Sequence, residues 1–203
     1  NHTVTPVGNA QISTAQSKYG GASMYFDGTG DGVYVADHPS FDVGSGDFTV
    51  EFWVYISSMA NNSFKIIYHK RLANTTDSTY MCLALLKPFF ANPSLRFFAS
   101  SNNTSWDIVD NFSFGLSPAS NTWHHVAIVR NGTEIAGYLN GVKGSNTITT
   151  SASIANTTLP FYIADDPNLD YDFAGYIDDF RFTKGTARYT SNFTPPTAAF
   201  PDP

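Results

Sequence analysis

Cysteine is almost absent from this sequence of 203 residues, which contains Cys82 alone. An internal disulfide is therefore excluded. A chain of this length buries enough apolar surface to fold without such crosslinks, so the missing disulfide does not fix the cellular compartment. The length predicts one large domain or two small ones.

Basic charge and long apolar runs are also scarce. Lys and Arg number 11 against 17 Asp and Glu, which gives a formal net charge of −6. No basic stripe is present, and this argues against nucleic acid as a partner. No apolar run approaches the roughly 18 residues of a membrane-spanning helix, so membrane insertion is not expected.

Strand patterns fill most of the chain. Residues 48–56 alternate between apolar and mixed side chains, and residues 123–130 are apolar on both faces, as in a central strand. Asn131-Gly132 and Asn140-Gly141 each stand between alternating runs and are strong hairpin signals. The pattern predicts an all-β, two-sheet antiparallel sandwich of about a dozen short strands. We expect four aromatic residues to be largely buried in it: Phe52, Trp53, Trp123 and Phe180.

Residues 175–182 form another predicted strand, and its carboxylates need an explanation. Regular alternation places Asp178 on one face with Tyr176, Phe180 and Phe182, and Asp179 on the other. A lone carboxylate among aromatic rings is costly unless it is neutralised. Two interpretations stay open, namely hydrogen bonds from a neighbouring loop and a bound metal ion.

The segment Asp27-Gly28-Thr29-Gly30-Asp31-Gly32 is the second acidic feature. A phosphate-binding loop would be followed by a helix, whereas a strand pattern follows here. A tight turn with exposed carbonyl and carboxylate oxygens fits better, and such turns can supply ligands to a hard cation.

Several motifs together resemble the concanavalin-A-like, laminin-G-like jelly-roll family. They lie in residues 25–31, 46–54, 123–132, 138–141 and 175–181. The tail, residues 185–196, is similar to a variant common in phage and environmental-virus structural proteins and in bacterial surface proteins. The resemblance implies a jelly-roll sandwich that binds carbohydrate or protein. It divides the chain into an N-terminal edge segment (1–16), the jelly-roll domain (17–193) and a Pro-rich arm (194–203).

The resemblance also implies a structural calcium ion that ties the first strands to the last one. Asp178 occupies the position of its usual side-chain ligand. Asp27 or Asp31 by side chain and Gly28 by its carbonyl are the candidates that complete the shell. The acidic segment of residues 165–172 is a second, lower-ranked candidate.

Catalysis is not expected. The glucanases among the relatives set two glutamates and an aspartate on alternate residues of one strand, and paired carboxylates are what glycoside hydrolysis requires. Glu51 and Glu134 are the only glutamates here, and their neighbours are apolar. His124 and His125 are adjacent in a strand and point to opposite faces.

Two loops have the composition of a sugar site, which combines aromatic rings with a few polar groups. The candidate ligand-binding residues are Asp165, Asp166, Asp170, Tyr171 and Asp172 in one loop and Trp106 in the other. The alternative is that Trp106 belongs to the core and that the aspartates only solvate a loop.

The function predicted from these residues is glycan recognition for adhesion or host attachment, outside a cell or on a virion surface. The alternative is a structural module of a fibre, capsid decoration or filament, which binds protein or copies of itself. Phe89 and Phe90 are its candidate interface, although we favour their folding back onto the core because large exposed apolar patches are uncommon.

Overall fold

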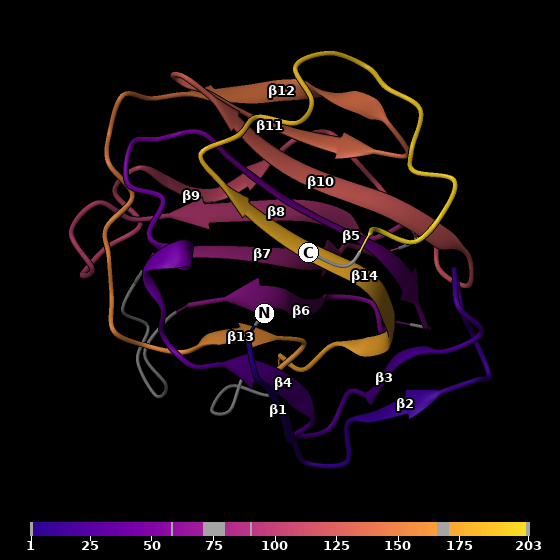
Figure 1. The fold of residues 1–203 in the computed structure, drawn as a ribbon. Coiled ribbons are helices and arrows are strands. Elements are labelled where there is room, and N and C mark those ends of the chain that lie inside the picture. The colour runs from indigo at the N-terminus through magenta and orange to yellow at the C-terminus, as the bar shows by residue number, and fades with distance from the viewer. Residues whose placement is uncertain (1, 58, 71–79, 90, 166–170, 202–203) are drawn as a thin grey trace.

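Two seven-stranded antiparallel sheets pack face to face in the computed structural model, which describes residues 2–57, 59–70, 80–89, 91–165 and 171–201 (Figure 1). Sheet A has the order β1 (Val4–Val7), β4 (Gly32–Val35), β13 (Phe161–Ile163), β6 (Ser63–His69), β7 (Met81–Lys87), β8 (Ser94–Ala99) and β9 (Val109–Ser113). Sheet B has the order β12 (Val142–Thr149), β11 (Glu134–Leu139), β10 (Trp123–Asn131), β5 (Phe48–Ile56), β14 (Ala174–Lys184), β3 (Ser23–Asp27) and β2 (Gln11–Ser13). The predicted all-β sandwich is confirmed.

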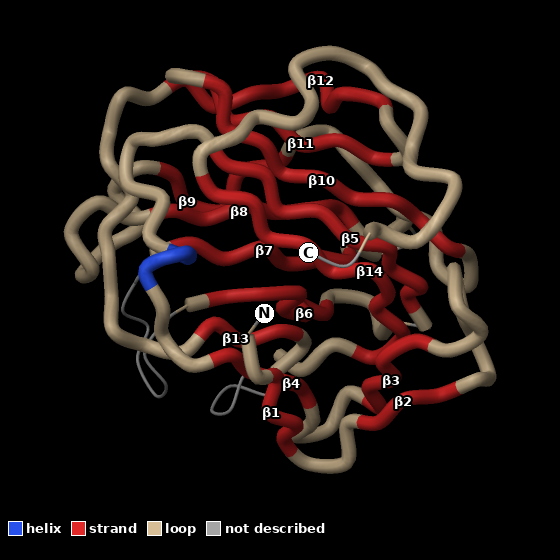
Figure 2. The backbone as a smooth tube through the Cα atoms, viewed as in Figure 1, coloured by secondary structure: helices blue, strands red, loops and turns tan. Residues whose placement is uncertain are grey.

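The part of the chain that the structure describes has almost no helix, as Figure 2 shows. The described residues contain one short 3-10 helix, η1 (Pro39–Phe41). No helix among them is long and apolar enough to cross a membrane. The N-terminal segment supplies one edge strand to each sheet, β1 to sheet A and β2 to sheet B.

Strand β5 lies in the middle of sheet B, between β10 and β14. Its inward side chains belong to the main core, and Phe52 is fully buried there. Its outward side chains Thr49, Glu51 and Trp53 are buried as well. Another layer of chain must therefore cover the outer face of sheet B, which is the face that points away from the core.

The end of the chain forms that layer. Residues 186–200 cross the outer face of sheet B, as the yellow segment of Figure 1 shows. Thr49 Oγ1 donates to the carbonyl oxygen of Thr186 at 2.9 Å, and Tyr19 Oη donates to that of Pro196 at 2.6 Å. The Pro-rich end thus packs on the sandwich rather than extending away from it.

The predicted burial of four aromatic residues is met by two of them, whereas Phe180 and Trp123 are half-buried. Phe52 and Trp53 are buried, and Phe180 packs against the main core. Trp123 is only half-buried because it lies on the outer face of sheet B. Its ring packs there on that of Tyr55, with 5.7 Å between the centroids.

A β-bulge in β14 corrects the predicted faces of that strand. The pairing with β5 shifts after Asp178, and Asp179 has a φ of 49°, which non-glycine residues rarely adopt. The extra residue turns Ile177 as well as Phe180 and Phe182 toward the core and leaves Asp178 on the outer face. The expectation that Asp178 shares a face with these phenylalanines is wrong, because simple alternation does not anticipate a bulge.

The hairpin between β7 and β8 gives a second correction. Phe89 is 58% exposed at this hairpin and does not fold back onto the core as favoured from the sequence. Phe90 lies outside the described residues. The role of Phe89 and Phe90 as an interface for assembly stays a prediction.

Candidate functional site

A pocket of about 410 Å³ opens on the outer face of sheet A. It combines aromatic walls with two polar side chains at one side. The lining residues are Phe64, Ile66, Cys82, Phe98, Trp106, Asp110, Asn111 and Tyr171.

The floor of the pocket is an apolar cluster separate from the main core. Cys82 on β7 lies directly opposite Phe98 on β8, so both side chains point to the same face. Phe64 and Trp106 pack on this cluster. The ring centroids of Phe64 and Phe98 are 5.8 Å apart, and those of Phe98 and Trp106 are 5.4 Å apart. The aromatic floor is therefore carried largely by paired strands, which fix its position.

Trp106 itself stands on a loop that hydrogen bonds hold in shape. Asn102 Oδ1 accepts a hydrogen bond from the N–H of Thr104 at 2.8 Å, and Asp107 Oδ1 accepts one from the N–H of Ser101 at 2.9 Å. The Ser101 hydroxyl and N–H hold the pKa of the Asp107 carboxyl below its usual value. These contacts place the indole ring against the strands without requiring that it enter the core.

Tyr171 reaches the same pocket from the other predicted loop. Its carbonyl oxygen accepts a hydrogen bond from the N–H of Ile66 at 2.7 Å, and its ring lies 5.1 Å from that of Phe64. The side chain is 36% exposed. The structure thus brings Trp106 and Tyr171 together, although they are far apart in the sequence. Ligand contact by these two residues stays a prediction.

Two of the aspartates predicted beside Tyr171, Asp165 and Asp172, do not line this pocket. Both are buried, so neither of them only solvates a loop. Ligand binding by Asp165 and Asp172 stays a prediction. Asp172 Oδ2 accepts a hydrogen bond from the N–H of Gly30 at 2.7 Å. Asp166 and Asp170 lie outside the described residues.

Six lining residues were missed by the sequence analysis, namely Phe64, Ile66, Cys82, Phe98, Asp110 and Asn111. The sequence does contain a signal for one of these residues, Phe98. Phe97 and Phe98 are adjacent in a strand, and adjacent side chains point to opposite faces. Phe97 fills the core and Phe98 the outer cluster. Two neighbouring large aromatic residues in a strand indicate that both of its faces are covered or used.

The turn at residues 27–32 does not adjoin Asp178. Asp27 lies opposite Ala174 on β14, four positions before Asp178. Asp31 is buried and accepts hydrogen bonds from the N–H groups of Asp27 and Gly28, at 2.7 and 3.2 Å. Burial raises the pKa of the Asp31 carboxyl. The Asp31 carboxylate therefore braces its own turn.

Asp178 has hydrogen-bond donors of its own. Its carboxylate accepts hydrogen bonds from the N–H groups of Lys18 at 2.9 Å, Tyr19 at 3.1 Å and Asp179 at 3.0 Å. Within the described ranges, no group of three or more His, Cys, Asp or Glu side chains is arranged to hold a metal ion. These residues do not fit one calcium site that joins Asp178 to the early turn. Calcium binding stays a prediction.

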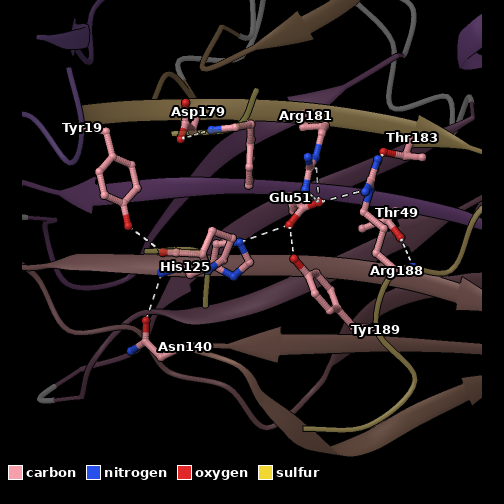
Figure 3. A network of polar contacts seen from close by, with 12 residues as sticks. Tyr19, Thr49, Glu51, His125, Asn140, Asp179, Arg181, Thr183, Arg188 and Tyr189 are labelled. Carbon is pink, nitrogen blue, oxygen red and sulfur yellow. Dashed lines mark hydrogen bonds and ion pairs between the residues drawn. The ribbon is translucent and has the colours of Figure 1, made fainter. Parts of the chain in front are cut away.

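A second polar cluster lies on the outer face of sheet B (Figure 3). Glu51 is fully buried. Arg181 donates to Glu51 Oε1 from Nε at 2.9 Å and from Nη2 at 2.7 Å, and Tyr189 Oη donates to Oε2 at 2.7 Å. His125 Nε2 lies 3.3 Å from Oε2. Burial alone would raise the pKa of Glu51, but His125, Tyr189 and Arg181 outweigh it and hold the pKa below its usual value.

The Glu51 cluster combines a carboxylate, an imidazole and a phenol, as catalytic sites do, but the end of the chain covers it. The rings of Tyr189 and Phe193 stack at 3.5 Å, and the Phe193 ring lies 5.6 Å from that of His125. Because Glu51 has no exposed surface, a substrate could not reach it in this arrangement. The contacts tie β5, β10 and β14 to the C-terminal segment.

A sequence profile of the concanavalin A-like lectin/glucanases superfamily matches residues 27–188. The chain belongs to this family. No curated protein matches it.

Among solved structures, one similar fold is domain 4 of AbnA, an extracellular arabinanase of Geobacillus stearothermophilus, in complex with arabinotriose. It has 18% identity and a TM-score of 0.64, with 91% of this chain and 83% of that chain covered. The binding domain of paraclostridial mosquitocidal protein 1 has 15% identity and a TM-score of 0.68, with 93% and 45% covered. The binding domain of botulinum neurotoxin DC, solved with rat synaptotagmin II, has 17% identity and a TM-score of 0.66, with 92% and 44% covered. The chain thus spans less than half the length of the toxin domains, and these likenesses show the fold.

The contacts of Asp178 lead to a test that separates hydrogen bonding from calcium binding. We expect Asp178→Asn to lower the free energy of unfolding by about 1.5–3 kcal/mol, the contribution of hydrogen bonds to a charged group. The loss should be the same with and without EDTA, as measured by urea denaturation. A chelator effect that is present in the wild type and disappears in Asp178→Asn would instead make Asp178 a calcium ligand.

The lowered pKa of Glu51 gives a prediction about acid stability. A glutamate with a depressed folded-state pKa stabilises the fold above its unfolded-state pKa of about 4.3, and this stabilisation is lost as the pH falls through the folded-state value. Glu51→Gln should cost about 3–5 kcal/mol at neutral pH, because it breaks a buried pair, and should flatten the dependence of stability on pH in the acid range.

The matched control for Glu51→Gln is Glu134→Gln. Glu134 pairs with Lys143 at 2.8 Å on the surface, where such pairs contribute about 0–1 kcal/mol. Denaturation between neutral and acid pH measures both variants. Equal losses in the free energy of unfolding for the two variants would show that the buried contacts of Glu51 do not hold the C-terminal segment on sheet B.

Proposed function

We propose that this chain is a non-catalytic glycan-binding module and that the pocket on sheet A is its binding site. The observation that carries the proposal is the meeting of Trp106 and Tyr171 over the aromatic floor, next to Asp110 and Asn111. Aromatic faces offer flat apolar area, and carboxylate and amide groups can bond to hydroxyls. Small-molecule sites in proteins share this combination of apolar walls and a few placed polar groups.

Membership of the lectin/glucanase superfamily supports a sugar ligand. So does the arabinanase domain, a similar fold that was solved with arabinotriose. The same comparison supports a location outside the cell, since that arabinanase is an extracellular protein. A virion surface fits the proposal equally well, because attachment to a host requires the same kind of site.

The charge of the pocket favours an uncharged glycan. Asp110 is the one charged residue in the described lining, and no lysine or arginine lines it. Arg96 on the same face of β8 donates to Ser94 Oγ and to the carbonyl oxygen of Asn111, at 3.1 and 3.3 Å. The chain as a whole carries a net charge of −6, which disfavours acidic sugars.

Trp106→Ala tests the proposed site. Loss of the main aromatic contact should weaken glycan binding by about tenfold or more, the equivalent of about 1.4 kcal/mol. Trp123→Ala is the control, since Trp123 is a half-buried tryptophan on the other sheet. A glycan array that includes neutral and sialylated sugars identifies the ligand class, and calorimetry measures the loss. Binding that survives in Trp106→Ala, or that is lost equally in Trp123→Ala, would contradict the proposal.

The alternative function is assembly through protein contacts, and the exposure of Phe89 favours it. A phenylalanine that is 58% exposed on a hairpin suits a contact with another chain. If this is the function, replacing Phe89 and Phe90 by serine should weaken self-association in sedimentation experiments while the melting temperature stays nearly constant. A large fall in melting temperature with association intact would show that the pair stabilises the fold instead.

A further inference from the structure

A lysine side chain is fully buried beside the end of β6. Lys70 follows this strand, and its side chain has no exposed surface. Its Nζ donates a hydrogen bond to Asp37 Oδ1 at 2.6 Å and a longer one to Asp42 Oδ1 at 3.3 Å. Asp37 lies after β4, and Asp42 is the C-cap residue of η1. Three segments that are separate in the sequence therefore meet at this amine.

The amine is shielded from water, whereas the two carboxylates are not. The ring centroid of Tyr80 lies 5.2 Å from Lys70 Nζ, and Tyr80 is fully buried. Burial, and then the Asp42 carboxylate, raise the pKa of the Tyr80 hydroxyl. The Asp37 side chain is 31% exposed and the Asp42 side chain 23%. A small molecule that is released at Asp37 can therefore reach the solvent.

The short contact between Lys70 and Asp37 suits a condensation of the amine with the carboxyl group. The Asp37 carboxyl carbon is one bond beyond Oδ1, so Nζ lies close to the separation of about 3–3.5 Å from which bonds form. Charges are costly in a protein interior, and transfer of one proton from the ammonium to the carboxylate removes both charges of the pair. The neutral amine is then a nucleophile, and the neutral carboxyl group is its electrophile.

We propose that Lys70 and Asp37 join in an intramolecular amide crosslink and that Asp42 carries the proton during its formation. Lys70 Nζ attacks Asp37 Cγ, and the N–C bond forms. The Asp42 carboxylate accepts a proton from Nζ and passes it to the hydroxyl group of the Asp37 carboxyl. The C–O bond to that hydroxyl breaks, and one water molecule leaves. The reaction consumes no oxidant, reductant or other co-reactant.

The crosslink does not depend on the proposed glycan site, and it gives the fold a covalent tie that its single cysteine cannot provide. It closes a loop of residues 37–70 and joins the segment after β4 to the end of β6, on either side of β13 (Figure 1). A covalent loop stabilises a protein chiefly by restricting the unfolded chain, as a disulfide does. The amide thus takes the place of a disulfide, and reducing agents do not break it.

Mass spectrometry of the purified, denatured chain tests the proposal. The wild type should weigh less than its sequence by one water molecule, about 18 Da, because a covalent change persists after unfolding. In a tryptic digest, residues 19–65 and 66–71 should remain joined, since trypsin does not cleave after an acylated lysine. A wild-type mass equal to that of the sequence would refute the crosslink and show that Lys70 and Asp37 form an ion pair only.

Two variants locate the chemistry. Lys70→Arg keeps a positive charge but cannot form the amide, so it should have the full mass of its sequence. Asp42→Asn should slow formation of the crosslink by about a hundredfold or more, because a side-chain amide cannot carry the proton. Most of this variant should therefore have its full mass, while circular dichroism shows that it folds. A mass loss that persists in Lys70→Arg would refute the crosslink, and complete crosslinking in Asp42→Asn would refute the role of Asp42.

The matched control is a lysine that pairs with a carboxylate on the surface. Lys143 Nζ lies 2.8 Å from Glu134 Oε2, but both side chains are partly exposed. Because water surrounds this pair, trypsin should cleave after Lys143 as it does after an unmodified lysine. An amide at Lys143 as well as at Lys70 would show that burial does not select the reacting pair.

Discussion

The outer layer of sheet B depends on the buried carboxylate of Glu51. A charge in the interior is tolerated only when donors surround it, and here the donors come from β14 and from the end of the chain. That requirement fixes the positions of Arg181 and Tyr189, and with them the path of the C-terminal segment. Tyr189 then stacks on Phe193, and the pair closes over His125. One carboxylate thus determines which surface of the sandwich is covered by its own chain.

The two outer faces differ as a consequence. On sheet B the outward side chains of Thr49, Glu51 and Trp53 on β5 are buried, and residues 186–200 cross this face. On sheet A the outward side chains of β6, β7 and β8 form a small cluster with a pocket above it. Both faces are aromatic, so composition alone does not distinguish them. The difference is that the C-terminal segment covers the outer face of sheet B, whereas the outer face of sheet A has a pocket.

The sequence predicted the regular parts of the fold and fewer parts of the site, for a physical reason. Alternation and the two Asn-Gly turns report local geometry, and β5, β10, β11 and β12 follow them. Trp106 and Tyr171 were identified by composition, but their meeting depends on pairing between distant strands. Phe98 was missed because its role follows from its cross-strand partner Cys82. The faces of β14 were misassigned because a single extra residue reverses the alternation.

The bulge in β14 explains how the neighbouring carboxylates of Asp178 and Asp179 can accept hydrogen bonds from segments near the two ends of the chain. Asp178 accepts hydrogen bonds from the N–H groups of Lys18 and Tyr19, and Asp179 Oδ2 accepts one from the N–H of Phe200 at 3.0 Å. Regular alternation would have sent these two side chains to opposite faces of the sheet. With the bulge, both hold segments on the outer face, and the Arg181 guanidinium covers the Phe200 ring at 3.7 Å. On the outer face, the carboxylates of Asp178 and Asp179 thus join β14 to residues 18–19 and to Phe200 through backbone N–H groups.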